Sequence, residues 1–312
     1  MLNANRVKTE FMLFLVVIIW GANYTVGKFG VAQLSPQWFT LLRFLIATPL
    51  MLLLTRWREK TWVIPRKYWG RLISSGLIGI SLYQTMFMLS VKYSTATDAA
   101  LLISLSPIFT AILGPIFGQE RLNLKGFIGA AIAFIGAAMV ILLGASYNNI
   151  TPHAMLGAVA GFIAAILWGV YPLVASPLVK VYSSLRVTAW SGVVGVVGLI
   201  LMIWWFPTPV TFQISLSAWL SILYAALPVT VFGLVAWYDG ISKMGSHAVM
   251  VYMFSIPVAA MLTAYFAIRE SIHLGQIIGA VIIFVGTVLL RSQSSHAATK
   301  AGQNLSTKSE ST

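Results

Sequence analysis

The residues best suited to binding a ligand are aromatic and amide side chains within long apolar runs. Trp20, Asn23 and Tyr24 are spaced three or one residue apart, so a helix would carry them on one face. Other runs contain further residues of this kind and a serine: Tyr83, Gln84, Trp168, Tyr171, Tyr252 and Ser255. An aromatic ring can contact the apolar body of a ligand while its N–H or O–H orients a polar group. We therefore predict that these side chains line a pathway for a small ligand; the alternative is an aromatic belt at a membrane interface.

Two charged residues in or beside the apolar runs are candidates for a charge pair or for coupling to protons. Arg43 lies within one run, where an unpaired charge is costly. Asp98 lies near the start of another run and is one potential partner for Arg43; water or the end of the run is another. A structural pair, or an arginine that reaches toward the interface, is favoured over a direct contact with the ligand.

Two prolines, Pro107 and Pro257, are expected in the middle of helices. Proline removes a backbone donor and clashes with the preceding turn, which kinks a helix. The carbonyl groups near Ile103 and Met253 would then lack their usual partners. We predict that the two prolines act as hinges beside a cavity; a packed structural kink is the alternative.

The sequence offers no constellation for catalysis or metal binding. It contains no H-E-x-x-H or G-x-S-x-G motif and no close pair of carboxylates within an apolar run. The absence of cysteine excludes disulfides, thiolate catalysis and thiolate zinc sites. We therefore expect no enzyme activity, no cofactor and no metal.

The composition of the chain indicates an integral membrane protein. Its 312 residues are 59% hydrophobic and 9% charged, whereas soluble domains carry about 25% charged residues. The mean hydropathy of +0.88 leaves too little polar surface to cover a water-soluble globule. Ten apolar runs are long enough to cross a bilayer as helices. They lie near residues 11–31, 36–55, 72–91, 97–118, 124–144, 154–175, 183–206, 216–241, 246–268 and 273–290.

The net charge of +13 indicates orientation in the membrane rather than binding of nucleic acid, because the basic residues fall in short segments between apolar runs. With the N-terminus in the cytoplasm, all 20 basic residues except Lys28, Lys92, Arg269 and Arg43 lie on the cytoplasmic side. Both termini are therefore expected to be cytoplasmic. Residues 292–312 have little to bury, which predicts a disordered cytoplasmic tail.

The sequence also repeats itself at a shift of 150 residues. This shift aligns the following pairs: Pro107 with Pro257, Glu120 with Glu270, Gly129 with Gly279, Phe134 with Phe284, and Gly136 with Gly286. The predicted fold is all-α, an integral membrane protein of ten transmembrane helices in two five-helix repeats, residues 1–145 and 146–291. Because five is odd, the second repeat would be inverted. Inverted repeats are typical of secondary transporters; a duplication that only builds a stable bundle is the alternative.

Several short motifs occur in a defined order along nearly the whole chain. They are Trp20-Gly21, residues 42–47 (LRFLIA), Ser106-Pro107, residues 118–122 (GQERL), Ser255-Ile256-Pro257 and Arg269-Glu270. In order and spacing they resemble the EamA-type members of the drug/metabolite transporter superfamily. The resemblance implies a ten-helix carrier of metabolites, often an exporter of amino acids or related compounds.

We therefore expect a carrier that exports small amino-acid-like metabolites across a bacterial inner membrane by alternating access. Its partners would be a small-molecule substrate and the lipid bilayer, with no nucleic acid, and it would be a monomer or a weak homodimer. A sugar-phosphate or nucleotide-sugar translocator is one alternative, although only Arg43 is placed deeply enough to bind an anion. A small cation or drug efflux carrier is another, although the first run offers Asn23 where a carboxylate would be expected.

Overall fold

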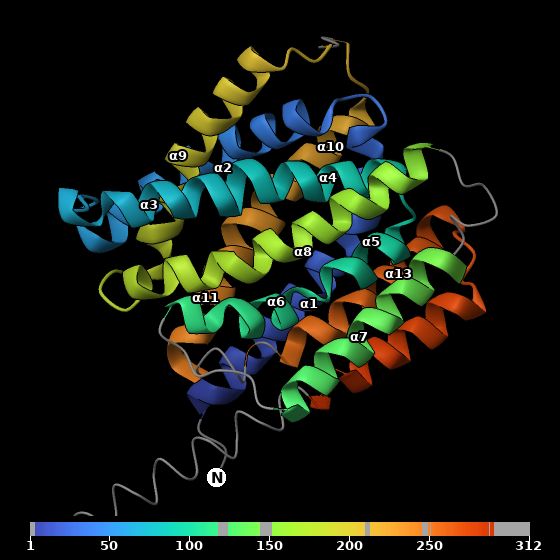
Figure 1. Cartoon of the computed structure of the whole chain (residues 1–312). Helices are drawn as coiled ribbons and strands as arrows, with labels where there is room; N and C mark the ends of the chain where they lie inside the picture. Colours follow the sequence, from blue (N-terminus) through green and yellow to red (C-terminus); the bar gives the residue numbers. More distant parts are fainter. Residues whose placement is uncertain are drawn as a thin grey trace, which may run out of the picture.

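The computed structural model describes residues 4–117, 124–143, 152–209, 213–244, 249, 251–286 and 288–289, and within these ranges it contains helices and no strand. The predicted tail at 292–312 and the segment around Glu120 lie outside them. The elements, in chain order (Figure 1), are α1 (Ala4–Val31), α2 (Pro36–Glu59), η1 (Arg66–Tyr68), α3 (Trp69–Gly76), η2 (Leu77–Leu82), α4 (Tyr83–Tyr93), α5 (Ala96–Ile103), α6 (Ser106–Leu113), η3 (Gly114–Phe117), α7 (Leu124–Leu143), α8 (Pro152–Val179), α9 (Ser184–Trp205), α10 (Leu216–Tyr224), η5 (Ala225–Leu234), α11 (Val235–Met244), η6 (Val251–Phe254) and α13 (Ser255–Ile268). A further helix occupies Leu274–Gly286.

Seven helical stretches among the described residues are long and apolar enough to cross a bilayer. They are Val7–Val31, Pro36–Glu59, Arg66–Tyr93, Ala96–Phe117, His153–Val179, Ser184–Trp205 and Leu216–Gly240. Three shorter apolar helices lie at Leu124–Val140, Ser255–Ile268 and Leu274–Gly286. Each apolar run identified in the sequence thus contains helix, and in the described ranges seven of them reach the length of a span.

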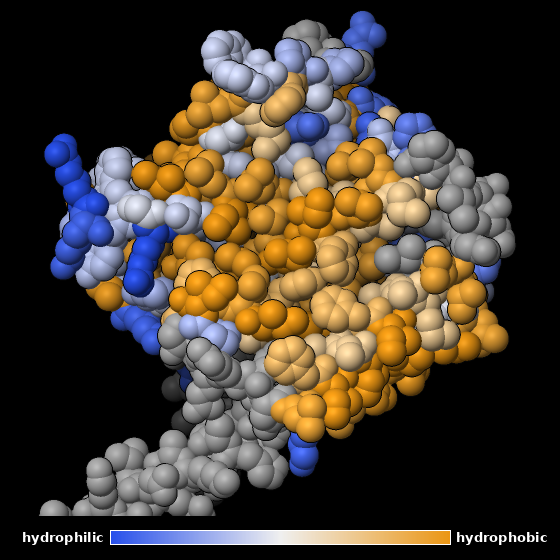
Figure 2. Space-filling model, in the orientation of Figure 1, coloured by the Kyte–Doolittle hydropathy of each residue, from blue (hydrophilic) through white to orange (hydrophobic). Residues whose placement is uncertain are grey.

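The outer surface is apolar along most of the bundle. Figure 2 shows a broad hydrophobic band with hydrophilic residues at its margins. Large apolar side chains such as Leu53, Phe127 and Trp204 are more than half exposed on the surface of the protein, which water would disfavour. Lipid hydrocarbon can cover such a surface, so the chain is a multi-pass membrane protein.

Serine caps define where several helices begin. Ser35, Ser183 and Ser215 have an extended backbone, and each side chain accepts a hydrogen bond from the N–H three residues further on, at the starts of α2, α9 and α10. Pro36 occupies the first turn of α2, where its missing N–H costs no helical hydrogen bond. Each of these serines therefore marks the end of a connecting segment and the start of the next membrane helix.

The span from Ala96 to Phe117 is broken, which corrects the prediction that Pro107 lies in the middle of a helix. α5 ends at Ile103 and α6 begins at Ser106, so Pro107 lies in the first turn of α6. The Ser106 hydroxyl donates to the Ile103 carbonyl at 2.8 Å. The carbonyl that was expected to lack a partner therefore has one, because a side-chain hydroxyl replaces the missing backbone donor.

Pro257 also lies at the beginning of a helix rather than in its middle, which is the second correction. The 3₁₀ turn η6 precedes α13, and Pro257 is the third residue of α13. Proline is tolerated in a first turn because the N–H groups there have no helical partner. The backbone nevertheless changes geometry beside both prolines, as their positions in the sequence indicated.

Two membrane helices contain π-helical segments, in which hydrogen bonds span five residues instead of four. η2 joins α3 to α4, and η5 joins α10 to α11. Within η5, Pro228 lacks a backbone donor, and the Thr230 hydroxyl donates to the Ala225 carbonyl at 2.7 Å. The carbonyl of Val229 accepts a hydrogen bond from Trp20 Nε1 of another helix, α1.

Helices that are distant in sequence pack against one another in the bundle: α1 against α13, α2 against α9, and α4 against α8 (Figure 1). Small residues allow the close approach. A side chain at Gly21 would overlap Ala259 of α13, and one at Gly157 would overlap Ser94 after α4. α1 also contacts α4, α10 and η5, so its polar face lies inside the bundle.

Candidate functional site

A cavity lies within the bundle, and the space between its lining residues is about 440 Å³ when the part open to solvent is included. It is lined by Trp20, Asn23 and Tyr24 of α1, Arg43 of α2, Tyr83, Gln84 and Phe87 of α4, Ile103 of α5, Trp168 of α8, Val229 and Leu234 of η5, Met253 of η6, and Ile256 of α13. Several of the irregular places in the helices border this cavity: the break after Ile103, the π-helical η5 and the 3₁₀ turn η6. Irregular backbone at membrane depth is tolerated where it is buried in protein or lines a cavity. The position of these interruptions beside the cavity agrees with that rule.

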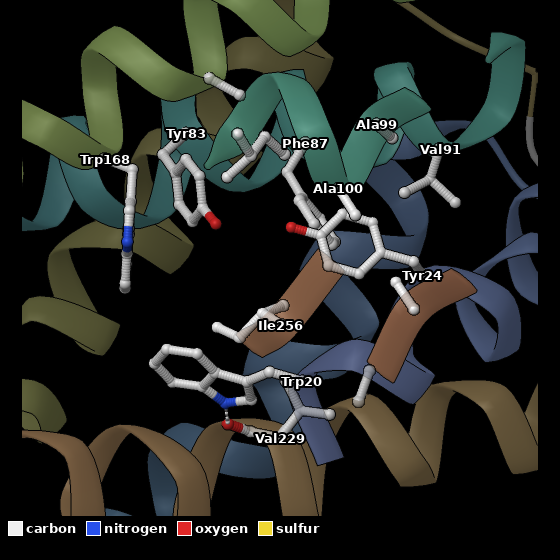
Figure 3. Close-up of a cluster of buried hydrophobic side chains, with 14 of the residues drawn as sticks. Trp20, Tyr24, Tyr83, Phe87, Val91, Ala99, Ala100, Trp168, Val229 and Ile256 are labelled. Atoms are coloured by element: carbon white, nitrogen blue, oxygen red, sulfur yellow. Dashed lines mark hydrogen bonds between the residues drawn. The ribbon is translucent and has the colours of Figure 1, made fainter. Parts of the chain in front are cut away.

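Aromatic rings form one wall of the cavity. Tyr83 stacks on Trp168 with ring centroids 4.7 Å apart, and Trp20 meets Trp168 edge-on at 5.8 Å. Tyr24 meets Phe87 edge-on at 5.0 Å. Figure 3 shows the hydroxyl oxygens of Tyr24 and Tyr83 pointing into the space between these rings. The wall therefore presents apolar faces and two hydroxyl groups to whatever occupies the cavity.

Trp20 is held in place by its own N–H group. Its Nε1 donates to the Val229 carbonyl at 3.1 Å (Figure 3), and its ring packs against Trp237 with centroids 5.0 Å apart. A side chain at Gly233 would overlap the Trp20 ring, so only glycine permits this approach. Trp20 therefore contributes a fixed apolar surface, and its N–H is already used within the protein.

Arg43 is buried at the cavity and pairs with neutral groups. Its Nε donates to the Thr230 hydroxyl at 2.6 Å, and its Nη1 donates to Gln84 Oε1 at 2.9 Å. The guanidinium carbon lies 5.3 Å from the centroid of the Phe44 ring. No ion pair to Arg43 occurs among the residues that the structure describes. The suggestion that Asp98 is its partner is therefore wrong.

Asn23 has an unusual environment for a buried amide. It is 3% exposed and lines the cavity, yet its Oδ1 has no hydrogen-bond partner within the described chain. Buried polar side chains are nearly always hydrogen-bonded, so an exception calls for an explanation. Asn23 lines the cavity as a residue, but the Oδ1 atom itself is enclosed by the protein and has almost no accessible surface.

Asp98 belongs to a separate polar cluster, the α5-end cluster, made of Lys28, Asp98, Glu270 and Gln276. Gln276 Nε2 donates to Asp98 Oδ1 at 2.7 Å. The Glu270 carboxylate accepts from the backbone N–H groups of Ala96 and Thr97, each at 3.0 Å, and Lys28 Nζ donates to the Ser94 carbonyl at 2.7 Å. These contacts bind the ends of α1, α4 and α13 to the start of α5.

Three of the predicted pathway residues do not line the cavity. Tyr171 lies behind the aromatic wall, stacked on Trp168 with centroids 5.7 Å apart and edge-on to Tyr238 at 5.9 Å. Tyr252 is half-buried and Ser255 is exposed, outside the lining. The prediction for these three is thus not met by the geometry, because neighbouring residues turn other side chains, Met253 and Ile256, toward the cavity.

Sequence reasoning missed the apolar part of the lining. Val229, Leu234 and Ile256 have no mark that separates them from the many aliphatic residues facing lipid. The π-helical geometry of η5 decides which residues of that helix face inward, and Pro228 is the signal that could have drawn attention to it. No three His, Asp or Glu side chains gather into a potential metal site in the described part of the chain.

A bundle of membrane helices that surrounds a cavity, lined from both halves of the chain, defines a polytopic membrane protein with an internal cavity. The chain belongs to the EamA-like transporter family, whose model matches it twice, at residues 7–142 and 155–292. It is therefore a member of the drug/metabolite transporter superfamily, a transporter and not an enzyme.

Relatives along nearly the full length agree with this assignment. A chain from Archaeoglobus fulgidus described as an "uncharacterized transporter" is 28% identical over 284 residues, covering 90% of this chain and 96% of the relative. The "probable amino-acid metabolite efflux pump" of Salmonella typhimurium is 27% identical (89% and 93% covered), and the "probable terminal-alkyne amino-acid exporter" of Streptantibioticus cattleyicolor is 25% identical (91% and 93%). A solved crystal structure that is 20% identical shares the fold with a TM-score of 0.65, covering 91% of this chain and 97% of its own.

Proposed function

We propose that this protein is a secondary transporter that exports small amino-acid-like metabolites across a bacterial inner membrane by alternating access. The observation that carries the proposal is the cavity itself: it is internal, its walls are aromatic and polar, and the helices around it are interrupted. A transporter must bind its substrate between moving parts, and interrupted helices allow such parts to move.

The moving parts would be two inverted five-helix repeats, residues 1–145 and 146–291. The two matches of one family model support the repeat. The π-helical segment at 77–82, shifted by 150 residues, falls at 227–232, within the π-helical η5 at 225–234. Gly21 packs on Ala259, and Gly169 packs on Phe109. Phe109 and Ala259 are 150 residues apart, whereas Gly21 and Gly169 are 148 residues apart. The breaks beside Pro107 and Pro257 are then the paired hinges.

The orientation in the membrane follows from the basic residues. Lys and Arg concentrate on the side that holds both chain termini, which favours a cytoplasmic position for that side. The α5-end cluster, with Lys28, then lies toward the external face. Since no nucleotide-binding motif occurs in the sequence, transport would draw its energy from a gradient.

The lining of the cavity supports an amino-acid-like substrate over the alternatives. Among the described residues that line it, Arg43 is the only cation and none is a carboxylate. A phosphate ester would favour several cations, and an organic cation would favour a carboxylate. The names of the Salmonella and Streptantibioticus relatives point in the same direction.

Proteoliposomes test this proposal. The purified full chain is reconstituted, loaded with unlabelled amino acids, and assayed for counterflow of labelled ones with and without a pH gradient. We expect counterflow of apolar amino acids that Trp168→Ala reduces severely and that Trp204→Ala, at a position 72% exposed, leaves intact. Exchange of sugar phosphates without any amino-acid transport would show that the proposed substrate class is wrong.

A further inference from the structure

Basic residues are concentrated in one connection of the bundle, between α2 and α3. Six of the 20 basic residues lie within residues 56–71, whereas no 16-residue window outside this segment contains more than two. All six are exposed, and together they form the 56–71 basic patch: Arg56, Arg58, Lys60, Arg66, Lys67 and Arg71. Orientation in the membrane depends on the bias summed over all connections of one side, so it gives no reason for gathering the charges in one of them.

The positive charges of the 56–71 basic patch are not balanced by the protein. Glu59 is the only acidic residue in the segment, and its carboxylate accepts hydrogen bonds from the Ser183 hydroxyl and, at 2.8 Å, from Arg186 Nε. None of the six basic side chains forms an ion pair with a residue that the structure describes. An anion can therefore bind to the patch without displacing an acidic side chain.

The connection that carries the patch is held against the bundle. Ile64, in its middle, is 4% exposed and packs in an apolar cluster with residues of α8 and α9. Its carbonyl accepts from Trp69 Nε1 at 3.1 Å, and Arg56 Nη1 donates to the Lys60 carbonyl at 2.8 Å where α2 ends. The basic side chains on both sides of Ile64 are thus presented from a fixed backbone, which lowers the entropy lost when a ligand binds.

Exposed apolar side chains on both helices lead up to the patch. Leu53 and Trp57 of α2 lie one turn apart and are 65% and 77% exposed, and Trp69 and Ile73 of α3 have the same spacing and are also exposed. Tryptophan is enriched where the hydrocarbon of a bilayer meets the headgroups. Figure 2 shows hydrophilic side chains at the margin of the hydrophobic band, on the left, where Figure 1 places the start of α3. The charges therefore begin where the lipid-facing surface ends.

We propose that the 56–71 basic patch binds anionic phospholipids. The headgroup phosphate contacts the arginine and lysine side chains, and the acyl chains lie along the exposed apolar faces of α2 and α3. A soluble phosphate or a nucleic acid would satisfy the charges alone, whereas a phospholipid also covers Trp57 and Trp69. This inference depends on the membrane location of the chain and not on which substrate the transporter carries.

Native mass spectrometry of the purified full chain tests the proposal. The chain is mixed with equal amounts of phosphatidylglycerol, which is anionic, and phosphatidylcholine, which has a phosphate but no net charge, both with the same acyl chains. We expect the wild-type chain to retain phosphatidylglycerol preferentially, and this preference should fall as the salt concentration rises, because exposed charges are screened.

A triple variant assigns the preference to the patch. A basic residue beside an anionic surface strengthens binding about five-fold, and one phosphate can contact one or two of the replaced side chains. Arg58→Gln, Arg66→Gln and Lys67→Gln together should therefore lower the preference for phosphatidylglycerol about 5- to 25-fold. The control replaces three exposed basic residues that are scattered along the chain, Lys8→Gln, Lys125→Gln and Arg269→Gln, and should keep the preference.

Three results would overturn the proposal. Equal retention of the two lipids by the wild-type chain would show that no anionic headgroup is recognised, and this comparison requires no variant to fold. An equal loss of preference in the control variant would show that net charge, and not the patch, decides the binding. Displacement of phosphatidylglycerol by an equal concentration of glycerophosphoglycerol, the same headgroup without acyl chains, would show that the patch binds soluble phosphates instead of lipid.

Discussion

Replacing Glu270 with alanine should loosen the junction between α13 and the start of α5. The two carboxylate oxygens accept hydrogen bonds from the backbone N–H groups of Ala96 and Thr97, each at 3.0 Å. These N–H groups belong to the first turn of α5, so no carbonyl of their own helix can accept from them. The negative charge also faces the positive end of the helix dipole.

The expected size of the effect follows from these contacts. Hydrogen bonds to a charged group contribute about 1.5–3 kcal/mol each, and Glu270 is half-buried, so losing both should lower the free energy of unfolding by about 2–4 kcal/mol. Glu270→Gln should lose about half of that, because the amide keeps one acceptor oxygen but no charge. Thr95 still accepts from the Asp98 N–H in either variant, so the helix start is weakened rather than abolished.

Two measurements check this prediction. Thermal unfolding in detergent, followed by tryptophan fluorescence, should rank the variants as wild type, Glu270→Gln, then Glu270→Ala. Hydrogen exchange should increase at the amides of Ala96 and Thr97, which lose their acceptors. Arg269→Gln, at the exposed neighbouring position, is the control and should leave both readouts unchanged. Unchanged stability and unchanged exchange in Glu270→Ala would refute the reasoning.

Three further predictions concern the cavity, the hinge and the topology. Trp168→Ala should weaken binding of L-phenylalanine by about 1–3 kcal/mol in calorimetric titrations, because a large apolar contact is lost. Trp204→Ala, at an exposed position, should not weaken it. If Trp168→Ala binds L-phenylalanine as tightly as the wild-type chain, the aromatic wall is not part of the site. Pro107→Ala restores a backbone donor in the first turn of α6, beside the break. The rate of counterflow should then fall more than the yield of folded protein. A normal rate per folded molecule would show that the break is purely structural. Reporter domains fused after Lys243 should read cytoplasmic and after Asn148 external, and a cytoplasmic signal at Asn148 would contradict the inverted repeat.

The sequence by itself determined the class of the protein. Apolar runs separated by short polar segments leave few alternatives to membrane helices, because backbone polar groups must be satisfied within the bilayer. The spacing of Trp20, Asn23 and Tyr24 was also sufficient to predict a shared inward face, because helical periodicity is a local property. The prolines correctly marked irregular backbone, although their helices begin beside them instead of continuing through them.

Only the tertiary structure decided which partners the polar groups have. Arg43 bonds to Thr230 and Asp98 to Gln276, pairs separated by 187 and 178 residues. Such contacts depend on how the helices cross and rotate against one another, and no local pattern in the sequence encodes these angles. The same holds for Tyr171, which turns behind the wall, and for Val229, which faces inward from a π-helical segment. The candidate site is therefore a property of the packed bundle, because its lining comes from both halves of the chain and Tyr83 of one half stacks on Trp168 of the other.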